Sequence, residues 1–517
     1  MYNNILRLYY FYNFVFFNRN IYMYNDYLII IWEVKNIKNY NLSSKLIILL
    51  ISILIIPSIA TGELYVNHEL DYDPFIDIVI TIEIYTIRGY VKTDNTSNFD
   101  FSILIEINNE QFFSPIWKNS RYLYDINWSI SKNIPDNIAE VSIKILLFDN
   151  NTPCDLNGIK NDSSIELVYD IRTNHWSGDD YIGDPSGYGR LNGCDDESFY
   201  EEEKDCEIWF NIYQNDIDND KIPTWAEINI YGSDPFIDNS NDDFDNDDVP
   251  FYWEHHWNYN PNVWDDHQNL DPDNDGLTNF EEFLTSGWFS DPFRKDLFIE
   301  LDQMELGPNG EGFKVPNSTK ELLADRYNPR NILYHLDDGC MGGGEIIPFD
   351  YVSWRGEILG IYQNYFLHND PNNWRRRVFR YAVFIYENPR ATAYAFVGEG
   401  RYINSNVRGI NSFQVTTTAV DNVVKKRNKP RDFVCASYIM HETGHTLGID
   451  IFNPFGCDNR RTVNPWRLCF WIFSNYKSVM NYRYVHQILD YSDGSNGLFD
   501  HDDWGTLNFN WFQLPEN

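Results

Sequence analysis

The sequence has few basic residues for its length. Its 517 residues include 40 Lys and Arg against 77 Asp and Glu, which gives a formal net charge of −37. Proteins that bind nucleic acid present a basic surface to the phosphates, so this composition argues against nucleic acid as a partner. Acidity keeps a protein soluble, and it also supplies the oxygen ligands that calcium prefers.

A long apolar run is also missing from the N-terminal region. The run at 46–56 is shorter than the about 20 residues that a membrane-spanning helix needs. Lys45 precedes it and Ser58-Ile59-Ala60 follows it, which is typical of a secretory signal with a small-residue cleavage site. We predict that residues 1–60 are a leader, either cleaved or kept as an attachment to a membrane or cell surface. The remainder is then extracellular or at the cell surface.

No Cys-x-x-Cys motif occurs among the 7 cysteines, which argues against a cysteine zinc site. Cys194 with Cys206, and Cys457 with Cys469, bracket short loops and are candidate disulfides, as suits an exported protein. The odd count leaves at least one cysteine without a partner in the same chain.

Residues 61–212 have the pattern of strands. Apolar residues alternate with others at 76–84, 99–107 and 141–145, and a period of two predicts a sheet with one buried face. Turns rich in Asn, Asp and Ser separate these runs, so we expect a β-sandwich. The acidic turn at 149–155 resembles those of C2-type sandwiches, which bind calcium between loops. A plain spacer or a substrate-docking domain is the alternative.

Residues 213–293 contain three acidic loops at nearly equal intervals. Each has aspartates at positions 1, 3 and 5 and a glutamate at position 12, the ligand positions of an EF-hand-type calcium loop. Only the third has glycine at position 6, so we expect Lys221 and Asp248 to require a different turn. The repeats resemble thrombospondin type 3 repeats, which implies a stiff spacer ordered by calcium; a solvated acidic linker is the alternative. The predicted ligands are Asp216, Asp218, Asp220 and Glu227; Asp243, Asp245, Asp247 and Glu254; and Asp271, Asp273, Asp275 and Glu282.

The segment His441-Glu442-Thr443-Gly444-His445 carries the most specific chemistry. Two histidines four residues apart lie on one face of a helix and can bind one zinc ion, with Glu442 placed as general base. We expect Asp432 to cap this helix and Gly448 to end it.

The segment Ser478-Val479-Met480-Asn481-Tyr482, together with Gly448, resembles the metzincin metalloproteases. The resemblance implies a methionine turn beneath the zinc at Met480 and a tyrosine, Tyr482, that reaches the metal or the reacting carbonyl. The family's third ligand position falls on Ile451, which cannot bind metal. We expect Asp450 to be the third ligand, with Asp458 as the alternative.

The chain is therefore predicted to be multidomain: a β-sandwich, a calcium-loop linker and an α+β metzincin-like domain at 294–517. In that domain we expect strands at 297–301, 381–386 and 413–418 and helices at 317–328 and 350–368. The predicted function is a secreted or surface-attached zinc-dependent endopeptidase that hydrolyses protein or peptide substrates, with structural calcium. The alternative is a non-catalytic calcium-dependent adhesion protein with a degenerate protease domain, in which Glu442 would not matter.

Overall fold

The computed structural model describes residues 17–24, 27–34, 78–90, 98–135, 137–156, 163–179, 189–193, 205–396, 412–449 and 455–509. The chain divides into two compact units, Met1–Asp71 and Tyr72–Asn517. In the first unit, β1 (Phe17–Tyr24) and β2 (Tyr27–Val34) form an antiparallel hairpin. The predicted signal segment at 45–60 lies outside the described residues. Over the described ranges, no helix has both the length and the apolar character to cross a membrane.

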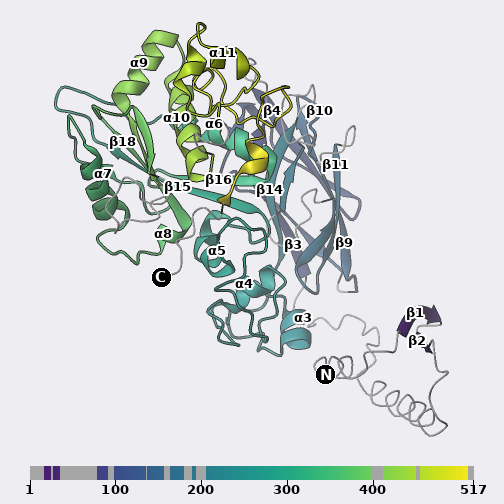
Figure 1. Cartoon of the computed structure of the whole chain (residues 1–517). Coiled ribbons are helices and arrows are strands. Elements are labelled where there is room, and N and C mark those ends of the chain that lie inside the picture. The colour runs from purple at the N-terminus through teal and green to yellow at the C-terminus, as the bar shows by residue number, and fades with distance from the viewer. Residues whose placement is uncertain are drawn as a thin grey trace. The chain divides into compact units, whose positions relative to one another are not determined.

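The larger unit begins with a β-sandwich of two antiparallel sheets (Figure 1). One sheet has the order β12-β11-β9-β4-β5, with β10 beside β9 and β6 beside β4. The other has the order β13-β14-β3-β7, with β8 beside β3. The first sheet consists of β4 (Phe99–Ile107), β5 (Glu110–Phe113), β6 (Trp117–Ser120), β9 (Glu140–Asp149), β10 (Thr152–Pro153), β11 (Ser164–Asp170) and β12 (His175–Gly178). The second consists of β3 (Ile78–Gly89), β7 (Tyr122–Leu123), β8 (Trp128–Ile134), β13 (Gly189–Asn192) and β14 (Cys206–Gln214).

The core of the sandwich confirms the strands predicted from the alternating pattern. Ile80, Ile82 and Ile84 of β3 are fully buried, and they pack in one cluster with Phe101 and Ile105 of β4. Side chains of a strand point alternately to opposite faces, so every second residue enters the space between the two sheets. The β-rich N-terminal part of the prediction is therefore correct.

The linker between the sandwich and the last domain is built from loops and short helices. Its helical segments follow the acidic loops and pack small apolar clusters around Trp253 and Phe251. They are α3 (Thr224–Ala226), η2 (Glu227–Tyr231), α4 (Phe251–His256), α5 (Asn279–Thr285) and η3 (Ser286–Trp288).

The last domain has one mixed sheet in the order β16-β15-β18-β20-β19, with β17 beside β15. All pairings are parallel except that of β19, which runs antiparallel to β20 at the edge. Helices α6, α9 and α10 pack on one face, and α7, η5 and α8 on the other (Figure 1). The strands are β15 (Lys295–Met304), β16 (Ile332–Asp337), β17 (Ile346–Ile347), β18 (Phe379–Ile385), β19 (Ala393–Phe396) and β20 (Ser412–Thr416). The helices are α6 (Ser318–Tyr327), η4 (Asn328–Arg330), α7 (Arg355–Ile361), η5 (Tyr362–Phe366), α8 (Arg375–Val378), α9 (Thr417–Arg427) and α10 (Arg431–Thr446).

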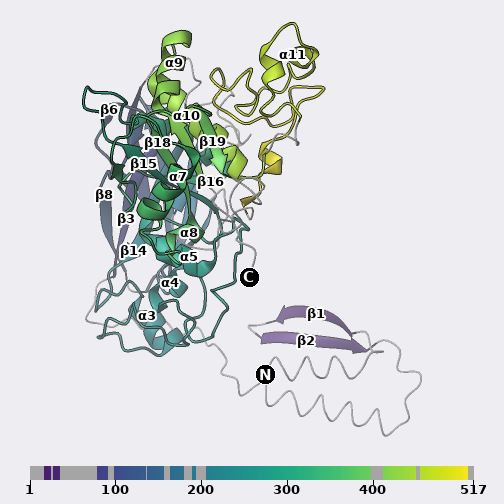
Figure 2. The ribbon, with the colours of Figure 1, turned by 60° about the vertical axis from the view of Figure 1, so that its left-hand side comes forward.

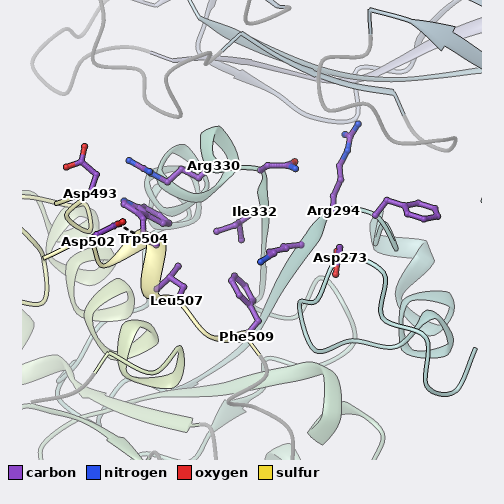
Figure 3. A pocket seen from close by; sticks show the side chains of 13 residues that line it. Asp273, Arg294, Arg330, Ile332, Asp493, Asp502, Trp504, Leu507 and Phe509 are labelled. Carbon is purple, nitrogen blue, oxygen red and sulfur yellow. Dashed lines mark hydrogen bonds between the residues drawn. The ribbon is translucent and has the colours of Figure 1, made fainter. Parts of the chain in front are cut away.

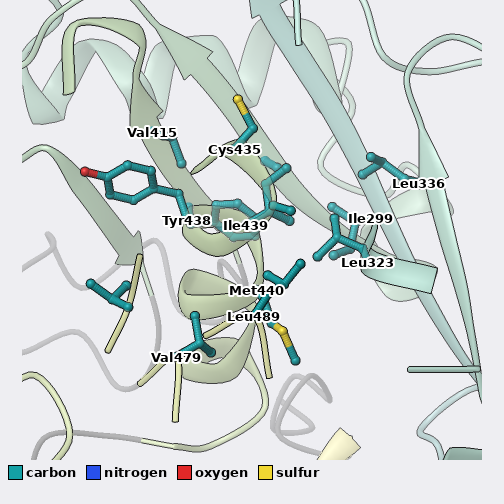
Figure 4. Packing of buried hydrophobic residues seen from close by; sticks show 14 of the residues in the cluster. Ile299, Leu323, Leu336, Val415, Cys435, Tyr438, Ile439, Met440, Val479 and Leu489 are labelled. Carbon is teal, nitrogen blue, oxygen red and sulfur yellow. The ribbon is translucent and has the colours of Figure 1, made fainter. Parts of the chain in front are cut away.

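Helix α10 lies at the centre of this domain's core (Figure 4). Its residues Ile439 and Met440 are fully buried, and they share a cluster with Leu323 of α6 and Ile299 of β15. Every residue of α10 from Val434 onward is buried, so the sheet and α6 fix the position of the helix that carries the two histidines.

After α10 the chain forms a lobe around α11 that carries no strand within residues 455–509 (Figure 2). Its helical segments are η6 (Arg460–Val463), α11 (Leu468–Ile472) and η7 (Trp504–Thr506). Cys469 is a free thiol, so the predicted Cys457–Cys469 disulfide is not formed. Cys194 lies outside the described residues, which leaves its predicted pairing with Cys206 open.

The sandwich and the last domain meet at a buried cluster of charges around Asp325 of α6. This carboxylate accepts hydrogen bonds from Arg88 Nη1 at 3.2 Å, Arg121 Nη2 at 2.7 Å and the Tyr122 hydroxyl at 2.6 Å. Asp325 is 1 % exposed and Arg88 4 %. Because α6 also packs against α10, the sandwich is docked beside the helix that carries the histidines.

We expect Asp325→Ala to lower the free energy of unfolding by about 3 kcal/mol, since it leaves the Arg88 guanidinium buried without this partner. Thermal and denaturant unfolding measure the change. Asp421→Ala is the matched control, because its partner Arg431 and its own carboxylate are both exposed, and it should change stability by less than about 1 kcal/mol. Equal effects of the two variants would contradict a rigid docking of the sandwich through Asp325.

Candidate metal centre

Helix α10 begins after Pro430 and ends at a left-handed glycine. Asp432 does not cap it: its carboxylate accepts hydrogen bonds from the Phe433 backbone N–H and the Ser318 hydroxyl, so that expectation was wrong. Gly448 has φ 92°, and the N–H of Ile449 reaches back to the carbonyl of Gly444 at 3.0 Å. This closing bond ends the helix where the sequence predicted.

The two histidines are held in one tautomer. His441 Nδ1 lies 2.8 Å from the carbonyl oxygen of Val479, and His445 Nδ1 lies 2.6 Å from that of Ile449. A carbonyl oxygen can only accept, so each Nδ1 carries a proton, and Nε2 is the nitrogen that faces Asp458 and binds a metal once it is deprotonated. Backbone bonds of this kind orient the histidine ligands of metal sites.

Asp458 supplies a third donor in front of the two imidazoles. Its Oδ1 lies 3.0 Å from His441 Nε2, and its Oδ2 lies 3.3 Å from His445 Nε2. The three ligand atoms lie within 4.8 Å of one another. Two buried imidazoles and one partly exposed carboxylate match the donor set of zinc sites that keep an open coordination position.

The backbone at Asp458 supports this placement. Its φ is 50°, in the left-handed region that few non-glycine residues adopt, and its N–H bonds to the Met480 carbonyl at 3.2 Å. Asp450, the expected third ligand, lies outside the described residues. The structure brings the alternative, Asp458, together with His441 and His445.

Glu442 and Tyr482 border the same space. Glu442 is 5 % exposed, and its carboxylate accepts a hydrogen bond from the backbone N–H of Ala395 on the edge strand β19. The Tyr482 ring stacks on the His441 ring with centroids 5.7 Å apart, and its hydroxyl bonds to Asp458. The sequence therefore placed both residues at the site, but it gave no sign of Ala395.

Met480 packs against α10 at Gly444. A Cβ added at Gly444 would lie 2.6 Å from the Met480 sulfur, so this turn of the helix and the methionine are in closest contact. Met480 is fully buried. Met480 therefore lies against the histidine helix, and its place beneath a zinc ion stays a prediction.

The charges at this centre depend on one another. Burial opposes protonation of His445, but hydrogen bonding to Asp458 outweighs it and raises the His445 pKa to about 9. Burial likewise opposes ionisation of Asp458, yet its bonds to both histidines bring the Asp458 pKa below its usual range. Burial raises the pKa of Glu442, in the direction that favours a proton acceptor effective near neutral pH.

The three acidic loops share one backbone conformation. Position 4 is an asparagine with φ between 61° and 65° in each loop: Asn219, Asn246 and Asn274. Position 6 is also left-handed in all three, with φ 74° at Lys221, 76° at Asp248 and 91° at Gly276. The expectation of a different turn in the first two loops was therefore wrong, because Lys221 and Asp248 adopt the conformation that glycine provides in the third.

The aspartates of each loop are held by matching hydrogen bonds. The N–H at position 5 bonds to the aspartate at position 1 at 3.1 to 3.2 Å, and the N–H at position 7 bonds to the aspartate at position 5 at 2.7 to 3.2 Å. These bonds turn the remaining oxygens toward the inside of the loop.

Several of those oxygens are buried without any hydrogen-bond partner. Burial raises the pKa of Glu227 to about 8 and that of Glu254 to about 7, and it raises the pKa of Glu282 well above its usual range. Buried carboxylates without partners are costly unless a cation pairs with them, so the observed residues fit a bound divalent ion. The unpartnered atoms are both oxygens of Asp218, Asp245, Glu254 and Glu282, with Asp220 Oδ2, Glu227 Oε2 and Asp273 Oδ2.

We expect Glu282→Gln to lower calcium affinity and to remove most of the stabilisation that calcium gives. A ligand at 100 times its Kd contributes about 2.7 kcal/mol to the folded state, so the calcium-dependent rise in Tm should shrink accordingly. Calorimetry with and without calcium measures both quantities. Asp234→Asn, an exposed residue between the first two loops, is the control and should leave them unchanged. An unchanged calcium response in Glu282→Gln would contradict the assignment of the third loop.

A cavity of 610 Å³ lies elsewhere, between the third acidic loop and the C-terminal segment (Figure 3). It is lined by Asp273 and Arg294 on one side and by Arg330, Asp502 and Trp504 on the other. None of the residues of the histidine centre lines this cavity, so it is separate from the candidate metal centre.

Comparisons with known proteins assign no family to the chain. No family model matches, and no curated protein matches. Among solved structures, a C2 domain-containing protein from an elicitor-responsive gene shares 15 % identity, with 26 % of this chain and 85 % of that chain covered and a TM-score of 0.17. A C2 domain of plant extended synaptotagmin 1 shares 7 % identity, with 26 % and 93 % covered and a TM-score of 0.16. Human GIVD cytosolic phospholipase A2 shares 12 % identity, with 27 % and 16 % covered and a TM-score of 0.17.

Proposed function

We propose that the chain is an exported zinc-dependent endopeptidase of the metzincin type. The arrangement of His441, His445 and Asp458 carries this proposal, because their donor atoms converge while each histidine Nδ1 is bound to a backbone carbonyl. Met480 beneath Gly444, and Tyr482 beside His441, give further support.

Zinc at this centre would supply a Lewis acid and lower the pKa of a bound water from near 16 to about 7. Glu442 accepts the proton of the attacking water and delivers it to the leaving amine. The Ala395 N–H holds the Glu442 carboxylate toward the edge strand. The Tyr482 hydroxyl, which bonds to Asp458 in this structure, would turn from that carboxylate to donate to the oxygen on which charge develops.

The edge strand β19 gives the substrate a place to bind. Among the described strands it pairs with β20 alone, and it runs antiparallel to it. An extended peptide that adds to this edge would form main-chain hydrogen bonds and pass directly by Glu442. This favours an endopeptidase that accepts protein or peptide segments in an extended conformation.

Calcium in the first and third acidic loops would order the linker, which favours an extracellular or surface location where calcium is plentiful. The third loop is fastened to the last domain, because Asp275 Oδ2 accepts the N–H of Asp296 at 2.6 Å in β15. Calcium binding there is therefore expected to support the sheet on which the histidine helix rests.

Casein hydrolysis by the purified chain, in calcium, tests the proposal. Activity that is lost on zinc chelation and restored by added zinc supports it. A folded, calcium-binding chain that neither binds zinc at His441 nor hydrolyses casein would favour the adhesion protein instead.

A further inference from the structure

A histidine, a residue type that the ligand pattern of a calcium loop lacks, packs against the second acidic loop (243–254) from a later part of the linker. This residue, His267, is fully buried against the loop, with its ring edge-on to Trp253 at 5.6 Å and to Tyr259 at 4.8 Å. Its Nε2 lies 3.2 Å from Asp247 Oδ2 and 4.0 Å from Glu254 Oε1. The donor atoms of these three residues lie within 4.8 Å of one another, close enough to share one ion.

Three of these donor atoms are buried without a hydrogen-bond partner: His267 Nε2 and both carboxylate oxygens of Glu254. Asp247 Oδ2 accepts the backbone N–H of Asp265 at 3.2 Å and forms an ion-pair contact with His267. A buried imidazole nitrogen beside two unpaired carboxylate oxygens is costly unless a cation joins them. A cation between them satisfies all three at once.

Asn279 shows how the imidazole would be oriented. Its amide nitrogen lies 3.0 Å from His267 Nδ1, while its Oδ1 is buried without a partner. The two ends of an amide fill the same space, so a half-turn places Oδ1 against Nδ1. Nδ1–H then donates to Asn279, and Nε2 directs its lone pair at Asp247 and Glu254, as in histidine metal ligands held from behind.

The other two loops provide an internal comparison. In each loop the aspartate at position 5 accepts a hydrogen bond from a backbone N–H further along the chain. The donors are Asn239 for Asp220, Asp265 for Asp247 and Asp296 for Asp275. The residue two positions after the donor is Asn241 at the first loop, His267 at the second and Phe298 at the third. Each of the three loops has a group of three aspartates that could hold calcium, and the second loop has in addition the group of Asp247, Glu254 and His267.

We propose that the second loop binds a divalent transition ion such as Zn²⁺ through Asp247, Glu254 and His267, in preference to calcium. Imidazole nitrogen favours zinc over calcium, which takes oxygen ligands almost exclusively. The site is structural, because the histidine and both carboxylates are buried within the linker. The proposal goes beyond the protease function and does not depend on it.

Zinc titration of the full chain carrying His441→Ala and His445→Ala, with calcium in excess, tests the proposal. One zinc site is expected, and adding His267→Gln should weaken it by at least about 10-fold. His368→Gln, which changes an exposed histidine, is the control and should leave the affinity unchanged. Equal affinity with and without His267, or full displacement of zinc by calcium, overturns the proposal.

A second measurement covers the case in which His267→Gln does not fold. A zinc-edge anomalous map from crystals of the chain with His267 intact should show an ion bonded to His267 Nε2. The proposal is overturned if the density lies only at Asp243, Asp245 and Asp247 and His267 contacts no ion. Neither readout involves proteolysis, so failure here is distinct from failure of the protease proposal.

Discussion

Glu442→Gln is expected to lower kcat/KM for peptide hydrolysis by about 10²–10⁴-fold, the range that general-base catalysis contributes. Glutamine keeps the size of the side chain and the bond from the Ala395 N–H, but it cannot take a proton from water. Zinc content should stay unchanged, because Glu442 is not among the three converging ligands. Steady-state kinetics on a fluorogenic peptide, with the metal content of the same samples, measure the effect.

Glu166→Gln is the matched control for this variant. Glu166 lies on the sandwich with its side chain 68 % exposed, and its loss should leave kcat/KM unchanged. Full activity in Glu442→Gln would assign the base to another residue or show that the hydrolysis comes from a contaminant.

The second large effect is expected at Asp458. Loss of a residue that only supports a metal ligand weakens binding by about 10–100-fold. Asp458→Asn removes a charged ligand itself, so we expect it to weaken zinc binding by more than this. Activity should fall with zinc occupancy and recover in part at high zinc. Zinc affinity, measured by competition with a chelator, gives the result directly.

Asp450→Asn separates the two candidates for the third ligand. Asp450 is nearer to the position where the metzincins carry their third ligand, but Asp458 Oδ1 lies 3.0 Å from His441 Nε2 in the structure. We expect Asp450→Asn to keep its zinc. Loss of zinc in that variant and retention in Asp458→Asn would reverse the assignment.

The sequence predicted those parts of the molecule whose signal is local. The period of two at 76–84 predicted β3, because buried and solvent-facing residues alternate along a strand. The spacing of His441 and His445 predicted one helix face, and Gly448 predicted its end. For the helix expected at 350–368, the structure has helical segments only at 355–366.

The remaining features depend on residues far apart in the chain. Arg88 and Asp325 meet across the interface between the sandwich and α6, and neither has a local pattern that marks it. The carbonyls of Val479 and Ile449 fix the histidine tautomers, but every residue carries a carbonyl and a sequence cannot show which ones are used. His267 is likewise a single histidine in an acidic stretch until the fold places it beside Glu254.

A zinc-edge anomalous difference map tests the central claim most directly. Crystals of the purified chain with zinc and calcium should show an ion about 2.0–2.2 Å from His441 Nε2, His445 Nε2 and an oxygen of Asp458. A well-ordered histidine centre without zinc-edge density in such crystals would contradict the assignment of these residues as a zinc centre, and with it the proposed protease.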